Sequence, residues 1–178
     1  MGAGVMDRET FRAIQGPLKT MYADQPERAL AELRAEGEVD FERLGCRVRL
    51  LVNDGRDLLA GLHAAAGGDG LAACSGELLL QALVTCAGTT LAAVAKALGV
   101  SPKSCVVSAT GWMNFRGTLG VDRTTSVGLT GVELKFAFAG EIPLDTMKKL
   151  VELSERYCVV LQTLRCGVSV QTSASVGI

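Results

Sequence analysis

The longest run of apolar residues in the chain extends from Ser75 to Gly99 and repeats with the period of an α-helix. Leu, Ala, Val and Thr occupy most positions on every face of this helix, so we expect it to be buried on nearly all sides. Ser75 is the expected N-cap, Glu77 lies in the first turn, and Gly99 followed by Pro102 ends the helix. One face carries five residues at helical spacing: Leu79, Leu83, Cys86, Thr90 and Ala93.

Two structural explanations compete with a functional one for this segment. A membrane span needs about 20 predominantly apolar residues, and the run is nearly that long. Polar residues interrupt it, however, and neither an aromatic belt nor a basic flank follows. The interrupting residues are Gln81, Thr85, Thr89, Thr90 and Lys96. The second explanation is that Cys86 is only a small buried hydrophobe, and the helix taken alone favours that role.

The first 44 residues are interpreted as an N-terminal helical extension, and residues 45–178 as the main domain. We expect residues 1–16 to be a leader without regular structure. From Pro17 to Ala35 the apolar positions follow a helical spacing, with Pro26 beginning a second short helix that Gly37 ends. The apolar stripe is narrow, which is typical of a surface or subunit-contact element.

The segment from Cys46 to His63 changes to the two-residue period of a β-strand. Apolar and polar positions alternate as far as Val52, and an Asp-Gly turn separates them from a second apolar run. This pattern predicts a β-hairpin, with Arg56 just beyond its turn. His63 is the single histidine of the chain, and we expect it to be solvated or hydrogen-bonded within the structure rather than a ligand.

The loop that leads into the long helix contains Gly68, Gly70 and Ala73, which match the G-x-G-x-x-A pattern of dinucleotide-binding folds. That pattern also requires an acidic residue about 20 positions later to hold the ribose. The sequence has no Asp or Glu between Glu77 and Asp122, and the β-α-β-α rhythm does not continue. We therefore reject a dinucleotide site.

Two long strands are predicted after the helix, from Ser104 to Phe115 and from Val127 to Phe138, where apolar and polar residues alternate. Pro143 begins a second helix with one apolar face, and residues 167–176 are expected to form a last strand. The helix face comprises Met147, Leu150, Val151, Ser154 and Cys158. The fold class is therefore α+β, with two helices packed on antiparallel sheet.

Composition narrows the function further. Charged residues make up 21% of the chain and the net charge is −1 without a basic block, which argues against nucleic acid or an anionic membrane as the main partner. The first residues lack the layout of a signal peptide, so we expect a cytoplasmic protein. Six cysteines without a C-x-x-C pair, together with one histidine, offer little for a metal site or a serine–histidine triad, and we expect no cofactor.

Any cysteine chemistry must therefore use thiols that the fold brings together. Cys86 lies midway along the long helix, and Cys158 lies near the end of the second helix. Two helices that pack on one sheet could place these thiols within bridging distance, although the sequence by itself leaves this open.

The segment ELLLQALVTCAGTTLAAVAKALG resembles the cysteine helix of the OsmC/Ohr superfamily, the osmotically inducible and organic hydroperoxide resistance proteins. The GGDG loop before it and the later ERYC segment also fit this pattern, over about residues 45–178. The glutamate spacing is more similar to the broad OsmC-like branch. The resemblance implies an intertwined homodimer with antiparallel sheets around the cysteine helix and a second helix, and with active sites at the subunit interface.

The resemblance also implies a thiol-dependent peroxidase that reduces organic hydroperoxides. Cys86 would be the peroxidatic thiolate and would become a sulfenic acid, and Cys158 would resolve it to a disulfide that a dithiol partner reduces. An arginine paired with a glutamate assists in the family. Arg56 is the first choice for that arginine, with Arg47 and Arg49 as alternatives, and Glu77 matches the glutamate, although a first-turn acid also has a structural explanation.

The chain departs from the family pattern at the second cysteine. The usual C-P-V-S is replaced by Cys158-Val159-Val160-Leu161, and Cys166 is a competing resolving residue. This departure, with the almost wholly apolar cysteine helix, motivates an alternative function: a binding protein that holds a small apolar ligand at the dimer interface. The other three cysteines, Cys46, Cys74 and Cys105, are expected to be structural.

Overall fold

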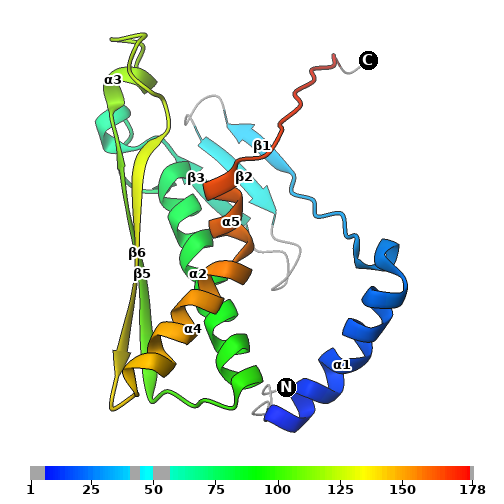
Figure 1. Cartoon of the computed structure of the whole chain (residues 1–178). Coiled ribbons are helices and arrows are strands. Elements are labelled where there is room, and N and C mark those ends of the chain that lie inside the picture. Colours follow the sequence, from blue (N-terminus) through cyan, green and yellow to red (C-terminus); the bar gives the residue numbers. More distant parts are fainter. Residues whose placement is uncertain (1–6, 41–44, 50–56, 177–178) are drawn as a thin grey trace.

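The computed structural model describes residues 7–40, 45–49 and 57–176 (Figure 1). Its centre is a two-stranded antiparallel ribbon of β5 (Ser104–Met113) and β6 (Leu129–Ala139), as the alternation predicts. Helices α2 (Ser75–Leu98), α4 (Leu144–Tyr157) and α5 (Val159–Cys166) lie beside this ribbon. The arrangement confirms the α+β class.

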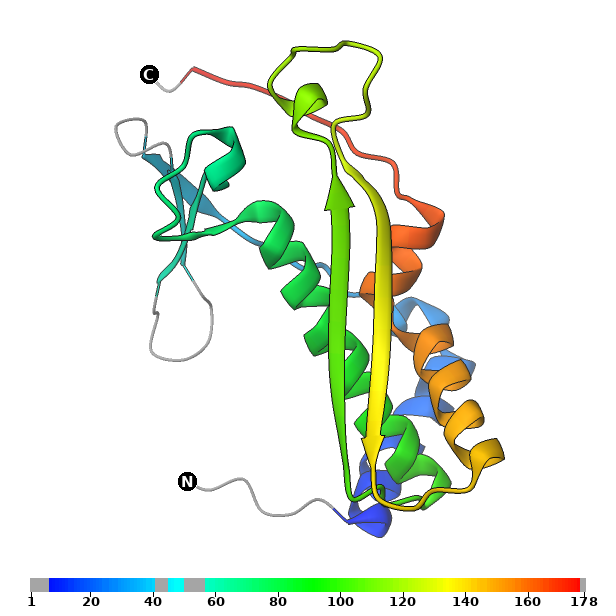
Figure 2. The same ribbon diagram turned by 90° about the vertical axis from the view of Figure 1, so that its left-hand side faces the viewer.

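A second sheet contains four short strands in the order β1-β2-β3-β4. Their bounds are β1 (Gly37–Asp40), β2 (Gly45–Arg49), β3 (Asp57–Gly61) and β4 (Ala73–Cys74). Strands β2 and β3 pair antiparallel, which confirms the hairpin, whereas its turn lies outside the described residues. Strand β1 differs from the expectation, because the sequence pattern predicts a helix that ends at Gly37 and no strand before Cys46. Figure 2 shows this sheet near the N-terminal end of α2, away from the long ribbon.

The long helix begins and ends through local interactions. Cys74, rather than the expected Ser75, is the N-cap, and its backbone N–H donates to the Glu77 carboxylate at 2.8 Å. In return, the Cys74 side chain lies against the Glu77 backbone N–H, and the two interactions together form a capping box. At the other end Gly99 adopts φ +72°, a left-handed conformation that glycine tolerates, and its N–H donates to the carbonyls of Ala95 and Lys96.

Only one stripe of α2 is fully covered, so the expectation of burial on nearly all sides is wrong for the single chain. The buried residues recur every fourth position: Leu83, Ala87, Leu91 and Ala95. The elements β5, α4 and α5 pack on the helix along this stripe. Among the described helices α2 alone has the length and composition of a membrane span, but its contacts with these three elements make it the core helix of the fold.

Two apolar clusters follow one another along the buried stripe. The first surrounds Leu83, Ala87, Cys158 and Leu161, and includes inward-facing residues of β5 and β6 such as Val107. The second surrounds Leu91, Ala95 and Leu150. Leu150 is 0% exposed, in agreement with the apolar face predicted for the second helix. Helix α4 thus packs on the core through the apolar face that its sequence predicts.

The N-terminal segment differs from the expected pair of short helices. Helix α1 (Arg8–Asp24) begins within the expected leader, because Asp7 caps it by accepting the Thr10 N–H at 2.8 Å. Pro17 lies inside this helix, on the exposed surface. The expected second helix is only one 3₁₀ turn, η1 (Pro26–Ala29), since Leu30 and Leu33 are exposed and find no packing partner among the described residues.

The last strand is also not observed. Residues 167–176 follow α5 as an extended segment without assigned strand structure, and Val168, Val170 and Val176 on it are exposed. A β-strand requires a neighbour that shares its backbone hydrogen bonds. The part of the chain that the structure describes pairs no strand with this segment, so its alternating pattern has no sheet to join.

His63 has the structural role that the sequence suggests. It caps the 3₁₀ turn η2 (Ala64–Ala66) by accepting the Ala65 N–H at Nδ1 over 3.0 Å. Its ring also stacks on Phe115, at the start of helix α3 (Phe115–Thr118), with 4.8 Å between ring centroids. These contacts confirm that the single histidine is held by hydrogen bonding and stacking.

The first testable prediction concerns the core. Leu83 is 0% exposed, so Leu83→Ala should lower the free energy of unfolding by about 2–5 kcal/mol through lost burial and a residual cavity. The matched control, Leu33→Ala, removes the same atoms from a side chain that is 89% exposed and should change stability by less than about 0.5 kcal/mol. Urea unfolding followed by circular dichroism measures both, and equal effects would contradict the position of α2 in the core.

Candidate active site

Cys86 lies in the middle of α2, next to the first core cluster. Its side chain is partly buried and packs against the residues around Leu83 and Cys158. Thr90, one turn later on the same face, directs its hydroxyl toward the Cys86 sulfur. The helix therefore presents this thiol toward the other helices.

Cys158 occupies the single position between α4 and α5. Its N–H donates to the Ser154 carbonyl at 2.9 Å, which completes α4, and its own carbonyl accepts the Gln162 N–H at 2.9 Å, which begins α5. The side chain is 0% exposed. The junction between the two helices thus places the Cys158 thiol in the core. Cys86 packs on the same cluster, and both cysteines are free thiols.

The first turn of α5 faces the Cys86 sulfur. Burial by itself would raise the pKa of the Cys86 thiol, because a thiolate is poorly solvated there. The backbone N–H groups of Val160 and Val159, the Cys158 thiol and the Thr90 hydroxyl stabilise the thiolate, and together they hold the pKa of Cys86 below its ordinary value. N–H groups at a helix N-terminus are suited to this task because they have no partner within their own helix.

Cys158 is shifted in the opposite direction. Burial raises the pKa of the Cys158 thiol, and its interaction with Cys86 raises it further, because a proton on Cys158 is shared with the neighbouring sulfur. The pair therefore loses its first proton from Cys86. One sulfur is prepared as a thiolate nucleophile and the other remains a thiol.

Two of the remaining proposed site residues, Glu77 and Arg47, are described by the structure, and each has a partner on another element or in the helix cap. Glu77 accepts a hydrogen bond from the Cys74 N–H as part of the helix cap. Arg47 forms an ion pair with Asp57 at 3.6 Å on the small sheet. Arg56 lies outside the described residues, as does the side chain of Arg49, so their positions relative to Cys86 stay predictions.

The other cysteines have separate surroundings. Cys46 lies in β2, Cys74 caps α2, and Cys105 packs beside the second cluster, where burial raises the pKa of its thiol. Cys166 is exposed at the end of α5. Among the described residues only Cys158 is a cysteine in the cluster with Cys86.

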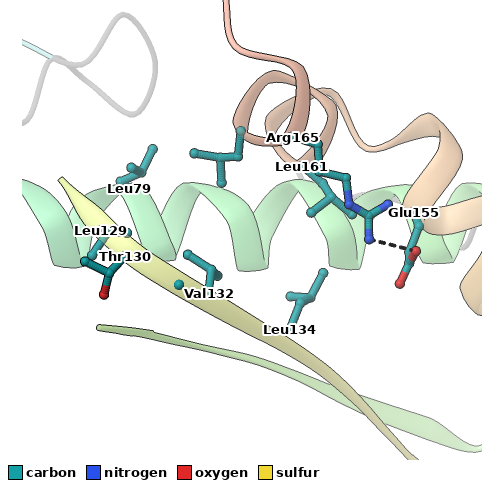
Figure 3. A pocket seen from close by; sticks show the side chains of 10 residues that line it. Leu79, Leu129, Thr130, Val132, Leu134, Glu155, Leu161 and Arg165 are labelled. Atoms are coloured by element: carbon teal, nitrogen blue, oxygen red, sulfur yellow. Dashed lines mark hydrogen bonds and ion pairs between the residues drawn. The ribbon is translucent and has the colours of Figure 1, made fainter. Parts of the chain in front are cut away.

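A groove of about 450 Å³ lies between β6 and α5, and Leu161 is one of its lining residues (Figure 3). Its wall is mainly leucine and valine, and Glu155 and Arg165 form its polar end. A second hollow, of about 570 Å³, lies along α2 beside Glu77. Cys86 lines neither of these two, so each is an adjacent space rather than a chamber around the thiol.

The backbone donors of Val159 and Val160 were missed from the sequence. Every residue except proline carries an N–H group, so residue type does not distinguish a donor that faces a thiolate. The absence of a proline after Cys158 is the one local signal, because both donors then stand free in the first turn of α5.

Comparison with known proteins supports the resemblance. The family described as OsmC-like protein matches residues 67–173, which is more than half of the chain, and the chain belongs to this family. No curated protein matches the sequence. The family match begins after α1 and the first three strands and includes both Cys86 and Cys158.

Solved structures show the same fold. An OsmC-like protein from Mycoplasma pneumoniae is 15% identical with a TM-score of 0.61, covering 78% of this chain and 89% of that one. An organic hydroperoxide resistance protein OsmC from Legionella pneumophila is 18% identical with a TM-score of 0.59, covering 76% and 92%. The organic hydroperoxide resistance protein OhrB of Bacillus subtilis is 17% identical with a TM-score of 0.55, covering 77% and 94%.

The site makes a prediction for thiol reactivity. A lowered pKa increases the thiolate fraction at a given pH, so alkylation of Cys86 by iodoacetamide should reach half its maximal rate at a lower pH than alkylation of Cys105 or Cys158. Mass spectrometry of each cysteine peptide across a pH series measures the order. A midpoint for Cys86 above that of Cys105 would show that the α5 donors do not stabilise its thiolate.

Proposed function

We propose that the protein is a thiol-dependent peroxidase that reduces organic hydroperoxides. The observation that carries this proposal is the contact between a free thiol with a lowered pKa, Cys86, and a buried free thiol with a raised pKa, Cys158. Membership of a family whose solved relatives include organic hydroperoxide resistance proteins supports the substrate class.

In the first step the Cys86 thiolate attacks the distal oxygen of the hydroperoxide. The sulfur–oxygen bond forms as the oxygen–oxygen bond breaks, and the alkoxide leaves as an alcohol after it takes a proton. Cys86 becomes a sulfenic acid. In the second step the Cys158 sulfur attacks the Cys86 sulfur, and the hydroxyl leaves with the Cys158 proton as water. A dithiol partner then reduces the disulfide and becomes a disulfide itself.

Cys158 is favoured over Cys166 as the resolving residue. The first turn of α5 touches the Cys86 sulfur, whereas Cys166 is at the far end of this eight-residue helix, about 10 Å further along its axis. Disulfides join residues whose Cα atoms are less than about 7 Å apart. Cys158 belongs to the cluster on which Cys86 packs, whereas Cys166 would approach Cys86 only if the helix moved.

Arg56 and Glu77 are proposed as the cation and carboxylate that assist Cys86. Glu77 precedes Cys86 on the same helix and lies about 13 Å from it along the axis. A carboxylate at that distance acts on the sulfur only through an intermediate group, so an arginine held by Glu77 would have to bridge the gap. Arg56 is assigned that role, with Arg47 and Arg49 as the alternatives.

We further propose that the working form is an intertwined cytoplasmic homodimer, in which residues 45–178 form the OsmC-like domain and residues 1–44 an extension. The small sheet supports this. The pairing register places the apolar residues Val39, Cys46, Val48, Leu58 and Ala60 on one face, yet not one of them is buried. The opposite face carries the Arg47–Asp57 ion pair. An apolar sheet face needs a covering layer, and a second copy would supply it.

A binding protein for a small apolar ligand is the second candidate. The leucine-lined groove beside α5 favours it, because a groove of this size and lining suits a small apolar molecule. On this alternative the thiols would be unreactive, and the ligand would accompany the purified protein.

The dimer predicts a specific effect of one substitution. Val48→Asp places a charge on the apolar face of the small sheet and should convert a dimer to a monomer, because the charge would be buried without a partner. Leu59→Asp is the matched control on the opposite face, where Leu59 is 56% exposed, and should leave the dimer intact. Sedimentation velocity distinguishes the two, and a monomeric parent protein would refute the dimer.

The peroxidase is tested by counting free thiols before and after one equivalent of cumene hydroperoxide, with peptide mapping. The parent protein should lose two thiols to a Cys86–Cys158 disulfide. Cys86→Ser should reduce turnover with a dithiol to the background rate, and Cys158→Ser should stop after one oxidation. Cys166→Ser is the control and should turn over normally.

Other outcomes have definite meanings. A Cys86–Cys166 disulfide would keep the peroxidase and replace the resolving residue. Six surviving thiols, together with an apolar ligand seen by native mass spectrometry, would reject the peroxidase in favour of the binding protein. Normal turnover by Cys86→Ser protein would remove Cys86 from the mechanism.

A further inference from the structure

Helix α5 is fastened to the end of α4 by two polar contacts. Arg165 Nη2 donates to Glu155 Oε2 at 3.0 Å, an ion pair that Figure 3 draws as a dashed line. Gln162 Nε2 donates to the Glu155 backbone carbonyl at 2.8 Å. Both contacts bring the later turns of α5 back to one residue in the last turn of α4.

This fastening matters because α5 is too short to hold its own position. An isolated helix of eight residues is not stable in water, so its position depends on what it packs against. Leu161 is its one buried side chain, and Val160 packs partly buried on the same cluster, so the apolar contacts with this cluster are made near the start of α5. The contacts to Glu155 hold its later turns.

The opposite end of α5 holds the reactive sulfur. Val160 and Cys86 pack on the same cluster beside Cys158, and the N–H groups of Val159 and Val160 help to lower the pKa of the Cys86 thiol. Hydrogen bonding weakens steeply as its angle departs from linear. A small rotation of α5 would therefore misalign these donors. We propose that Glu155 and Arg165 are positioning residues, whose ion pair sets the direction in which α5 presents its N-terminal N–H groups to Cys86.

This inference rests on the proposed role of Cys86 as a thiolate nucleophile. Cys158 is the titratable group beside Cys86, and Thr90 on α2 is a polar neighbour. The apolar residues packed on the same cluster include Val107 of β5 and Phe136 of β6. The Arg165 and Glu155 side chains are 52% and 38% exposed, so their ion pair adds little to global stability. Their effect is expected on the geometry of the thiol site.

The test uses two variants that remove charges of opposite sign, Arg165→Met and Glu155→Gln, in the full chain. If the two charges acted on Cys86 directly through space, loss of the cation would raise the pKa of Cys86 and loss of the anion would lower it. If the ion pair acts by positioning α5, loss of either charge raises the pKa of Cys86. The readout is the pH dependence of Cys86 alkylation by iodoacetamide, which needs no peroxide and so stands apart from peroxidase turnover.

We expect both variants to shift the Cys86 midpoint upward by roughly half a pKa unit, which is about threefold less thiolate at a pH below the midpoint. Arg165→Lys, which keeps the cation, should restore part of the shift. Arg156→Met is the matched control, because Arg156 lies in the same turn of α4 but stacks over Tyr157. It should leave the midpoint unchanged.

Shifts of opposite sign for Arg165→Met and Glu155→Gln would overturn the inference, and so would an unchanged midpoint in either variant. An equal shift in Arg156→Met would also overturn it, as a general effect of charge. Thermal unfolding checks that each variant is folded. If Arg165→Met does not fold, Glu155→Gln, which preserves the shape of the side chain, provides the test. An upward shift of the Cys86 midpoint in that variant supports the positioning role, and a downward shift overturns it. An inactive parent protein with a low Cys86 midpoint would refute the peroxidase and leave the positioning role standing.

Discussion

The close packing of the α4–α5 junction against the middle of α2 is the contact on which the rest of the structure depends. Small side chains make it possible: Ala87 on α2 and Ser154 and Cys158 at the junction are all at most 1% exposed. Ser154 satisfies its buried hydroxyl within its own helix by donating to the Leu150 carbonyl at 2.6 Å. Because these residues are small, the helices approach closely enough for α5 to reach Cys86.

The same contact makes the two thiols chemically different. Cys86 faces helix donors that stabilise an anion, whereas Cys158 is enclosed and keeps its proton beside a neighbouring sulfur. Two equivalent thiols would compete for ionisation, but here the arrangement decides which one loses its proton first. The order of ionisation matches the order that a peroxide reaction followed by resolution requires.

The sequence was sufficient where an element is determined by its own residues and one nearby neighbour. The alternation in β5 and β6, the hairpin of β2 and β3, and the apolar face of α4 were all predicted, since each depends on local period. The pairing of Cys86 with Cys158 came from the family resemblance, because no spacing rule joins residues so far apart. The donors at Val159 and Val160 could not be predicted, as they are backbone groups placed by tertiary packing.

Three of the predictions that differ from the structure share a physical feature. Burial around α2, a strand over 167–176 and a helix through Leu30 and Leu33 each require a second surface that the single chain does not place there. The apolar face of the small sheet lacks a cover in the same way. An apolar pattern persists in a sequence when it is buried in the functional assembly, so four uncovered patterns in one chain support the proposed homodimer. On that proposal the sequence patterns describe the dimer, and the differences arise because a single chain provides only half of each contact.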